Sequence, residues 1–209
     1  MAIVVVGGHT RNIGKTSVVA GIIGRTPEMR WTAMKITQYG HGICSANGEA
    51  CDCATADHSL AITAERDPET GTDSARFLKA GAVRSLWVRT QQGSLLEAMP
   101  AVRKEIARAE NAILESNSVM QFLRPDVYLA VLDHATADFK PSALAALDRA
   151  DAILLRASGA GLQPQWTGVS AKLFANKPVF EIGPPEWVSD ELVQFVRDRI
   201  ASQSSPISA

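Results

Sequence analysis

The chain has 209 residues, of which 46% are hydrophobic, and its formal net charge is −1. This length suits one domain with one packed core. Lysine and arginine are scattered along the chain, so the sequence carries no electrostatic footprint for a nucleic acid. Its apolar runs are far shorter than the roughly 18 residues that a membrane span needs, and its N-terminus lacks the basic start of a signal peptide. We expect a cytoplasmic protein that binds neither nucleic acids nor membranes.

Predicted strands and helices alternate along the first half of the chain. In order, they are a strand over 3–6, a helix over 16–24, a strand over 31–37, a helix over 72–79 and a strand over 85–90. The first strand is continuously β-branched, which is typical of a strand buried on both faces. The first helix carries apolar residues at helical spacing. Thr72 is placed to cap the second helix and Gly81 to end it.

The same alternation continues to the C-terminus. The elements are a helix that opens at Ser94, strands over 111–115 and 126–132, a helix over about 141–149, strands over 151–155 and 178–182, and a helix over 189–201. Ser94 begins a capping-box pattern, and Pro100 is expected to kink or restart its helix. Strands joined by crossover helices predict an α/β fold with a doubly wound, mostly parallel sheet of about seven strands. We expect one domain over residues 1–201 and a flexible tail over 202–209.

A glycine-rich loop joins the first strand to the first helix. It reads GGHTRNIGKTS, and a strand before it with a helix after it is the context that a P-loop requires. The backbone amides of such a loop converge on phosphate oxygens, and the helix adds the positive end of its dipole. Lys15 is placed to reach the β- and γ-phosphates, while Thr16 offers its hydroxyl to Mg²⁺. The residues expected to hold the nucleotide are Gly8, Arg11, Asn12, Ile13, Gly14, Lys15, Thr16 and Ser17.

The spacing of this loop departs from the standard one, whose first glycine would fall on His9. The longer loop resembles that of dethiobiotin synthetase and of the cobyric-acid-type amide synthases. Residues 33–38 (AMKITQ) resemble the dethiobiotin synthetase segment whose lysine, Lys35 here, sits near the transferred phosphate. Residues 72–82 resemble the molybdopterin-guanine dinucleotide biosynthesis adaptor protein. Together these resemblances imply the signal-recognition/MinD-like class of P-loop NTPases.

Mg²⁺ at a phosphate site needs one or two carboxylates, and the chain offers three candidates. Glu115 ends its strand and by resemblance takes the place of the magnesium-binding glutamate in the Glu-Gly loop of dethiobiotin synthetase. Ser-Asn-Ser follows it in place of glycines, so this loop is expected to present different groups to a substrate. Asp133, which ends the next strand, is the Walker-B-like alternative, and Asp73 is the third candidate. The expected catalytic residues are Lys15, Lys35 and Glu115, with Lys35 neutralising charge on the γ-phosphate.

The sequence says less about the base of the nucleotide. Asn176-Lys177-Pro178-Val179 is superficially similar to the guanine-reading Asn-Lys-x-Asp, but the aspartate is missing and the segment precedes a strand instead of following one. ATP is therefore favoured over GTP.

Residues 38–71 show little periodicity, and we expect them to be an insertion after the second strand. The candidate metal ligands within it are Cys44, Cys51, Cys53, His41 and His58. Thiolates with imidazole suit Zn²⁺ or an iron–sulfur cluster, and a closed zinc site takes four ligands. A disulfide, idle thiols or a single redox thiol are the alternatives. The insertion leaves the strand that carries Lys35, which would place it beside the γ-phosphate.

Three functions fit these features. The first is a Mg²⁺-dependent ATPase or GTPase that serves metal-centre or cofactor maturation in a client enzyme, and the Cys/His cluster favours it. The second is an ATP-dependent small-molecule ligase or kinase of the dethiobiotin synthetase type, which Lys35 and Glu115 favour. The third is a nucleotide-gated adaptor, which Asp73 and its neighbours favour. A homodimer is implied by the resemblance alone.

Overall fold

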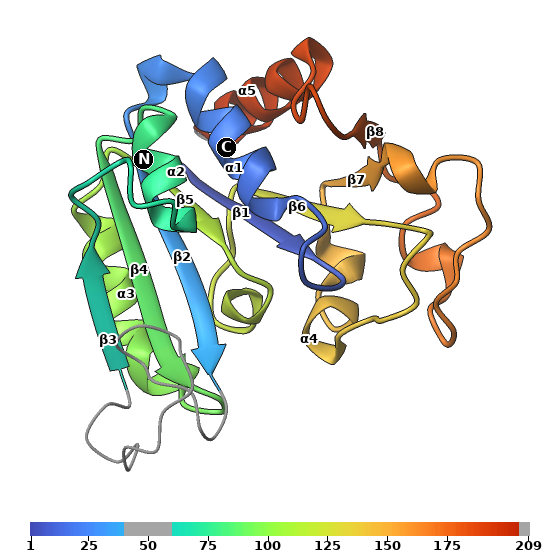
Figure 1. Ribbon diagram of the computed structural model, residues 1–209, viewed down its shortest axis with the longest axis horizontal. Coiled ribbons are helices and arrows are strands. Elements are labelled where there is room, and N and C mark those ends of the chain that lie inside the picture. The colour runs from blue at the N-terminus through green and yellow to red at the C-terminus, as the bar shows by residue number, and fades with distance from the viewer. Residues whose placement is uncertain (40–59, 205–209) are drawn as a thin grey trace, which may run out of the picture.

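The computed structural model describes residues 1–39 and 60–204, and Figure 1 shows how their elements are arranged. The candidate metal ligands His41, Cys44, Cys51, Cys53 and His58 lie outside the described residues. The expected metal site therefore stays a prediction.

Eight strands form one sheet in the order β3-β4-β2-β5-β1-β6-β7-β8. Their bounds are β1 Ile3–Gly8, β2 Trp31–Tyr39, β3 Leu60–Ala64, β4 Arg84–Gln91, β5 Asn111–Glu115, β6 Val127–Leu132, β7 Ala152–Arg156 and β8 Val179–Ile182. Every neighbouring pair is parallel except β3 and β4, which are antiparallel. The mostly parallel sheet is thus confirmed. The carboxyl ends of β1, β5 and β6 meet at one edge, where this architecture binds its ligands.

The expectation of seven strands was one too few, because β3 lies within the segment 38–71 that was expected to lack periodicity. The strand has five residues and pairs with β4 at the edge of the sheet, with Ile62 opposite Val88. Leu60 and Ile62 are partly buried and pack against the core beneath them. So short an edge strand, followed at once by charged residues, gives a weak sequence signal.

Helices cover both faces of the sheet, as a doubly wound fold requires. The α-helices are α1 Lys15–Arg25, α2 Asp73–Lys79, α3 Leu95–Ala107, α4 Pro141–Leu144 and α5 Asp190–Ser204. The apolar sides of α1, α2 and α5 share one core cluster with Val4 and Val6 of β1. The apolar side of α3 shares the other with Val5, whose side chain points to the opposite face. Figure 1 shows α1, α2 and α5 on one side of the sheet and α3 on the other.

Some helix boundaries differ from expectation. α3 runs through Pro100 without a break, and the carbonyl that loses its partner belongs to Leu96, a residue that is 65% exposed. The Ser94 side chain makes no capping hydrogen bond, so the expected capping box does not form.

Two further differences lie toward the C-terminus. The helix expected over about 141–149 is only α4 and a 3₁₀ turn at Leu147–Arg149, because its buried side chains are two alanines and one leucine. α5 extends to Ser204, into the expected tail. Within the described part of the chain, the helices are all too short or too polar to cross a bilayer.

Candidate nucleotide site

The loop between β1 and α1 has the backbone of a phosphate-binding loop. β1 ends at Gly8 and α1 begins at Lys15. Asn12 and Gly14 have φ values of 57° and 98°, in the left-handed region where glycine and asparagine are tolerated best. The Val18 amide donates the first helical hydrogen bond, to the carbonyl of Gly14 at 2.9 Å. The amides of the first turn of α1 precede that bond and are available to an anion.

Gly14 also meets a close packing constraint. A Cβ at this position would lie 1.9 Å from Cζ3 of Trp187, so the indole ring rests directly against the loop. The Arg156 guanidinium, from the end of β7, lies 5.1 Å from the Trp187 ring. Only glycine fits here, for reasons of both backbone angle and space.

Lys15 folds back over the loop. Its Nζ donates a 2.6 Å hydrogen bond to the carbonyl of Thr10. Burial is the main cause that lowers the pKa of Lys15 to about 8, although the Glu115 carboxylate opposes the shift. A bound phosphate would add to the negative charge that this ammonium group receives from Glu115 and Asp73.

A chain of charged and polar contacts begins at Thr16. Its hydroxyl donates to Oε2 of Glu115 at 2.7 Å, and Oε1 of the same carboxylate accepts from Nζ of Lys35 at 3.1 Å. Lys35 also pairs with Asp73, the first residue of α2. The sheet register explains the contact, because Lys35 and Glu115 are directly opposite each other on β2 and β5. Burial lowers the pKa of Lys35, but Glu115 and Asp73 raise it by more, so this lysine stays charged.

Asp133 belongs to a different set of contacts. Its carboxylate accepts from the amide of Ala135 at 2.9 Å and lies 3.5 Å from the hydroxyls of Thr136 and Ser158. It therefore caps its own turn and faces the end of β7, while Glu115 faces Thr16.

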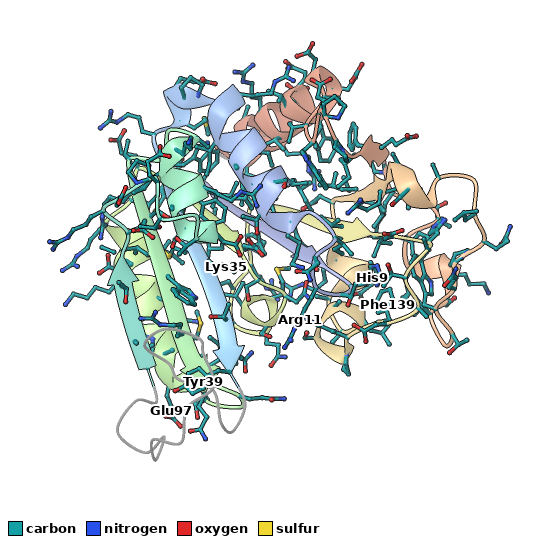
Figure 2. The ribbon with its side chains drawn as sticks, in the orientation of Figure 1. His9, Arg11, Lys35, Tyr39, Glu97 and Phe139 are labelled. Carbon is teal, nitrogen blue, oxygen red and sulfur yellow. The ribbon has the colours of Figure 1, made fainter. Side chains whose placement is uncertain are left out.

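His9 contacts Asp133 from inside the protein, with 0% of its surface exposed. Its Nε2 accepts from the backbone amide of Asp133 at 3.0 Å, which leaves Nδ1 to donate to the carbonyl of Asp138 at 2.7 Å. The bond that Nε2 accepts requires a neutral ring, and burial lowers the pKa of His9. The ring stacks on Phe139 and packs against Trp166, each with centroids 5.1 Å apart. Figure 2 shows His9 and Phe139 on one side of the loop and Lys35 on the other.

Asn117 holds the loop from the side of β5. Its Oδ1 accepts from the Gly8 amide and its Nδ2 donates to the Gly8 carbonyl, both at 2.7 Å. The Ser116 hydroxyl accepts from the Val119 amide at 3.3 Å. In this structure both side chains bind the backbone of the protein itself, and the expectation that Ser-Asn-Ser presents groups to a substrate stays a prediction. Sequence reasoning noticed the departure from glycine but missed its role, because the contact joins residues 109 positions apart.

The remaining residues of the loop differ in how far they are exposed to solvent. Arg11 and Asn12 are exposed at its tip, where Figure 2 shows Arg11. Ile13 is 3% exposed and packs under Gly8. The Ser17 hydroxyl accepts a 2.9 Å hydrogen bond from Nη2 of Arg76 on α2, a residue that sequence reasoning did not single out.

The donor set around Thr16 suits Mg²⁺. The hydroxyl of Thr16 and the carboxylate of Glu115 are hard oxygen ligands 2.7 Å apart beside the loop, and Mg²⁺ usually adds phosphate oxygens and water to one or two such groups. No three acidic, histidine or cysteine side chains gather at a metal-binding distance anywhere in residues 1–39 or 60–204. Glu115 contacts Thr16 and Lys35, whereas Asp133 faces Thr136 and Ser158, and the expected roles of Glu115, Asp133 and Asp73 at a magnesium site stay predictions.

A cavity opens next to the charged contacts. Its volume is about 310 Å³ and its lining includes Lys35, Asp73 and Trp87. A second cavity, of about 680 Å³, lies around Arg124, Arg149 and Arg199 and includes none of the loop residues. Only the smaller one shares residues with the candidate site.

Comparison with known proteins supports the fold and leaves the family open. No protein-family model matches the chain, and no curated protein matches it. HypB from Helicobacter pylori, solved in complex with nickel, has a TM-score of 0.51 at 13% identity, over 99% of this chain and 90% of that chain. LpxK from Aquifex aeolicus, solved in complex with ATP, has a TM-score of 0.47 at 18% identity, over 87% of this chain and 53% of that chain. The chain accordingly has a mostly parallel α/β fold like that of HypB.

Proposed function

We propose that this protein binds and hydrolyses a nucleoside triphosphate with Mg²⁺, with ATP favoured over GTP. The observation that carries the proposal is the contact between Thr16 and Glu115 at the start of α1, beside a loop of left-handed Asn12 and Gly14 and a buried Lys15. Such a loop binds phosphates through its amides. Mg²⁺ held by Thr16 and Glu115 would neutralise phosphate charge.

The preference for ATP rests on the absence of a guanine-reading motif. Lys177 donates to the carbonyls of Asp148 and Ala150, both at 2.7 Å, just before β7 begins. That is the amino end of the strand, and the phosphate loop lies at the carboxyl ends. Asn176-Lys177 is thus in the wrong place to read a base.

The decisive experiment is a binding titration with fluorescent ATP and GTP analogues in Mg²⁺. Lys15→Ala should weaken binding about a hundredfold, because a buried cation facing the phosphates is lost. Lys104→Ala removes the same charge from the exposed side of α3 and should change nothing. Equal affinities in the wild type and Lys15→Ala would refute the phosphate-loop assignment.

A role in metal-centre or cofactor maturation is the finer part of this proposal. It rests on the clustering of Cys44, Cys51, Cys53, His41 and His58 in the sequence. The nickel in the HypB structure belongs to that protein, and a similarity at 13% identity concerns the fold alone. β2 runs four residues beyond Lys35, about 13 Å of strand, and ends at Tyr39, whereas the cluster lies outside the described residues.

Elemental analysis tests this part. Protein purified without oxygen and without a metal-affinity tag should carry near-stoichiometric zinc, or iron with a thiolate-to-iron absorption band. Metal-free, fully folded protein would argue against a structural metal site. A client enzyme and a homodimer belong to the same proposal, and co-purification with size-exclusion analysis would test them.

The cavity beside Lys35 favours a second function, transfer of a phosphoryl group to a small acceptor. Its volume of about 310 Å³ suits a small molecule, and Lys35 lies both in its lining and against Glu115. Phosphate release that depends on an added small molecule would support this function. Release in buffer alone, unchanged across a panel of carboxylates, amines and alcohols, would support hydrolysis.

A further inference from the structure

We infer that Arg76 of α2 binds a phosphate group of the nucleotide. This inference rests on the proposed function. Its starting observation is the 2.9 Å hydrogen bond from Nη2 of Arg76 to the hydroxyl of Ser17. Ser17 follows Thr16 directly, in the first turn of α1, where the free amides of the helix point toward the phosphates. Arg76 therefore places a guanidinium group at the edge of the phosphate site.

The backbone of Arg76 is held firmly. The Thr72 hydroxyl accepts from the Ala75 amide at 3.1 Å and caps α2. The Ser85 hydroxyl of β4 donates to the Ser74 carbonyl at 2.8 Å, and Phe77 is fully buried in the core that α1 shares. A helix that is capped, bonded to β4 and packed against the core of α1 gives its side chains a defined reach.

The guanidinium group itself keeps the capacity to bind an anion. Its carboxylate neighbour Asp73 is 3.8 Å away, a long ion pair, and Asp73 is engaged more closely by Lys35. The Ser17 hydroxyl is a neutral acceptor. Arginine carries five donors in a planar fork, and a phosphate oxygen accepts more strongly than a hydroxyl does. A nucleotide phosphate would thus be a better partner than either group that Arg76 has now.

This assignment gives α2 two links to the nucleotide. One is Arg76, and the other is Asp73, which pairs with Lys35 next to Glu115. Arg11, the arginine within the loop, lies exposed at its tip, away from α2. Arg76 thus supplies a positive charge on the side of the site formed by α1 and α2.

The test measures the dissociation constants of Mg²⁺-nucleoside diphosphate and of a non-hydrolysable triphosphate, in both base forms. Arg76→Ala should weaken both about tenfold, the size expected for one charge-assisted hydrogen bond. Arg76→Lys keeps the charge and should recover part of the loss. Lys79→Ala is the matched control, because Lys79 lies on the same helix and pairs with Glu69 on the exposed surface. Thermal melting of each variant checks that α2 still folds.

The expected result is different if Arg76 only holds Ser17 in place and does not contact the phosphate. In that case Ser17→Ala would weaken binding as much as Arg76→Ala, and adding Arg76→Ala to Ser17→Ala would cost nothing more. Phosphate binding by Arg76 requires about a tenfold loss in the Ser17→Ala background as well. The double variant therefore supports or overturns the assignment.

Failure of the inference is distinguishable from failure of the proposed function. If wild-type binding depends on Lys15 but Arg76→Ala binds within twofold of the wild type, Arg76 is not a phosphate ligand and the nucleotide site stands. If the wild type binds no nucleotide, or binds it equally well after Lys15→Ala, the proposed function fails and the inference fails with it.

Discussion

The two flanks of the phosphate loop differ in the partners that their side chains have. On the side of β5 and β2, Thr16, Glu115, Lys35 and Asp73 bind one another through side chains, and three of the four are charged. On the side of β6, His9 takes its partners from the backbone and packs between aromatic rings.

This difference separates chemistry from support. Side chains that bind only one another can exchange those partners for Mg²⁺ and phosphate without unpairing the backbone. Side chains that satisfy buried backbone groups are costly to move, because each buried donor or acceptor left unpaired lowers the free energy of unfolding by about 1–3 kcal/mol. The charged flank is suited to the nucleotide. The flank of β6, where the His9 ring is neutral, is suited to holding the loop in shape, as Asn117 does from the end of β5.

The sharpest way to break this comparison is to neutralise one carboxylate on each flank. Glu115→Gln should lower Mg²⁺-dependent turnover about a hundredfold, because the group nearest Thr16 loses its charge. Asp133→Asn should lower it less than tenfold, because that carboxylate caps its own turn. Steady-state kinetics at saturating Mg²⁺ measure both. A larger loss in Asp133→Asn would move the magnesium role to the flank of β6.

A second test concerns the joint between β5 and the loop. Asn117→Ala leaves both backbone groups of Gly8 without their partner and should lower the free energy of unfolding by about 2 kcal/mol. Asn176→Ala, at an exposed position, should change it by less than about 0.5 kcal/mol. Chemical denaturation measures the difference. Equal stabilities would show that Gly8 is held by the rest of the loop.

The sequence was most informative where a local pattern carries its own physical reason. The β-branched run before a glycine-rich loop fixed the placement of β1 and α1, and Glu115 was found because it ends a strand. The ordering of Glu115 before Asp133 as the magnesium candidate stays a prediction, and Glu115 is the carboxylate that contacts Thr16.

What the sequence did not reveal depends on contacts between distant segments. His9 was noticed only as a missing glycine, and its bonds to Asp133 and Asp138 span more than a hundred positions. The same holds for Asn117 with Gly8 and for Arg76 with Ser17. β3 was missed for another reason: an edge strand of five residues buries little and has little pattern to detect.

A third test uses the titration of His9, on the flank of β6. Burial lowers the pKa of His9, so below about pH 6.5 the unfolded chain binds more protons at this residue than the folded protein does. Stability should therefore fall with decreasing pH, by up to about 1.4 kcal/mol per unit. His9→Gln should show a shallower slope between pH 6.5 and 5 than the wild type. Parallel slopes in His9→Gln and the wild type would locate the titration elsewhere.

The smallest expected effect is the proton that Lys15, between the two flanks, takes up when nucleotide binds. Its pKa of about 8 in the free protein means that about half of the molecules lack this proton at pH 8. Bound phosphate favours the charged lysine and raises the pKa, so nucleotide binding should take up about half a proton at pH 8 and much less at pH 6.5. Calorimetric titration in two buffers of different ionisation enthalpy measures this uptake. Uptake that stays the same at both pH values would mean that the ammonium group is already fully charged in the free loop. The negative charge of the charged flank would then raise the pKa of Lys15 by more than burial lowers it. The separation between the two flanks would be weaker than their contacts indicate.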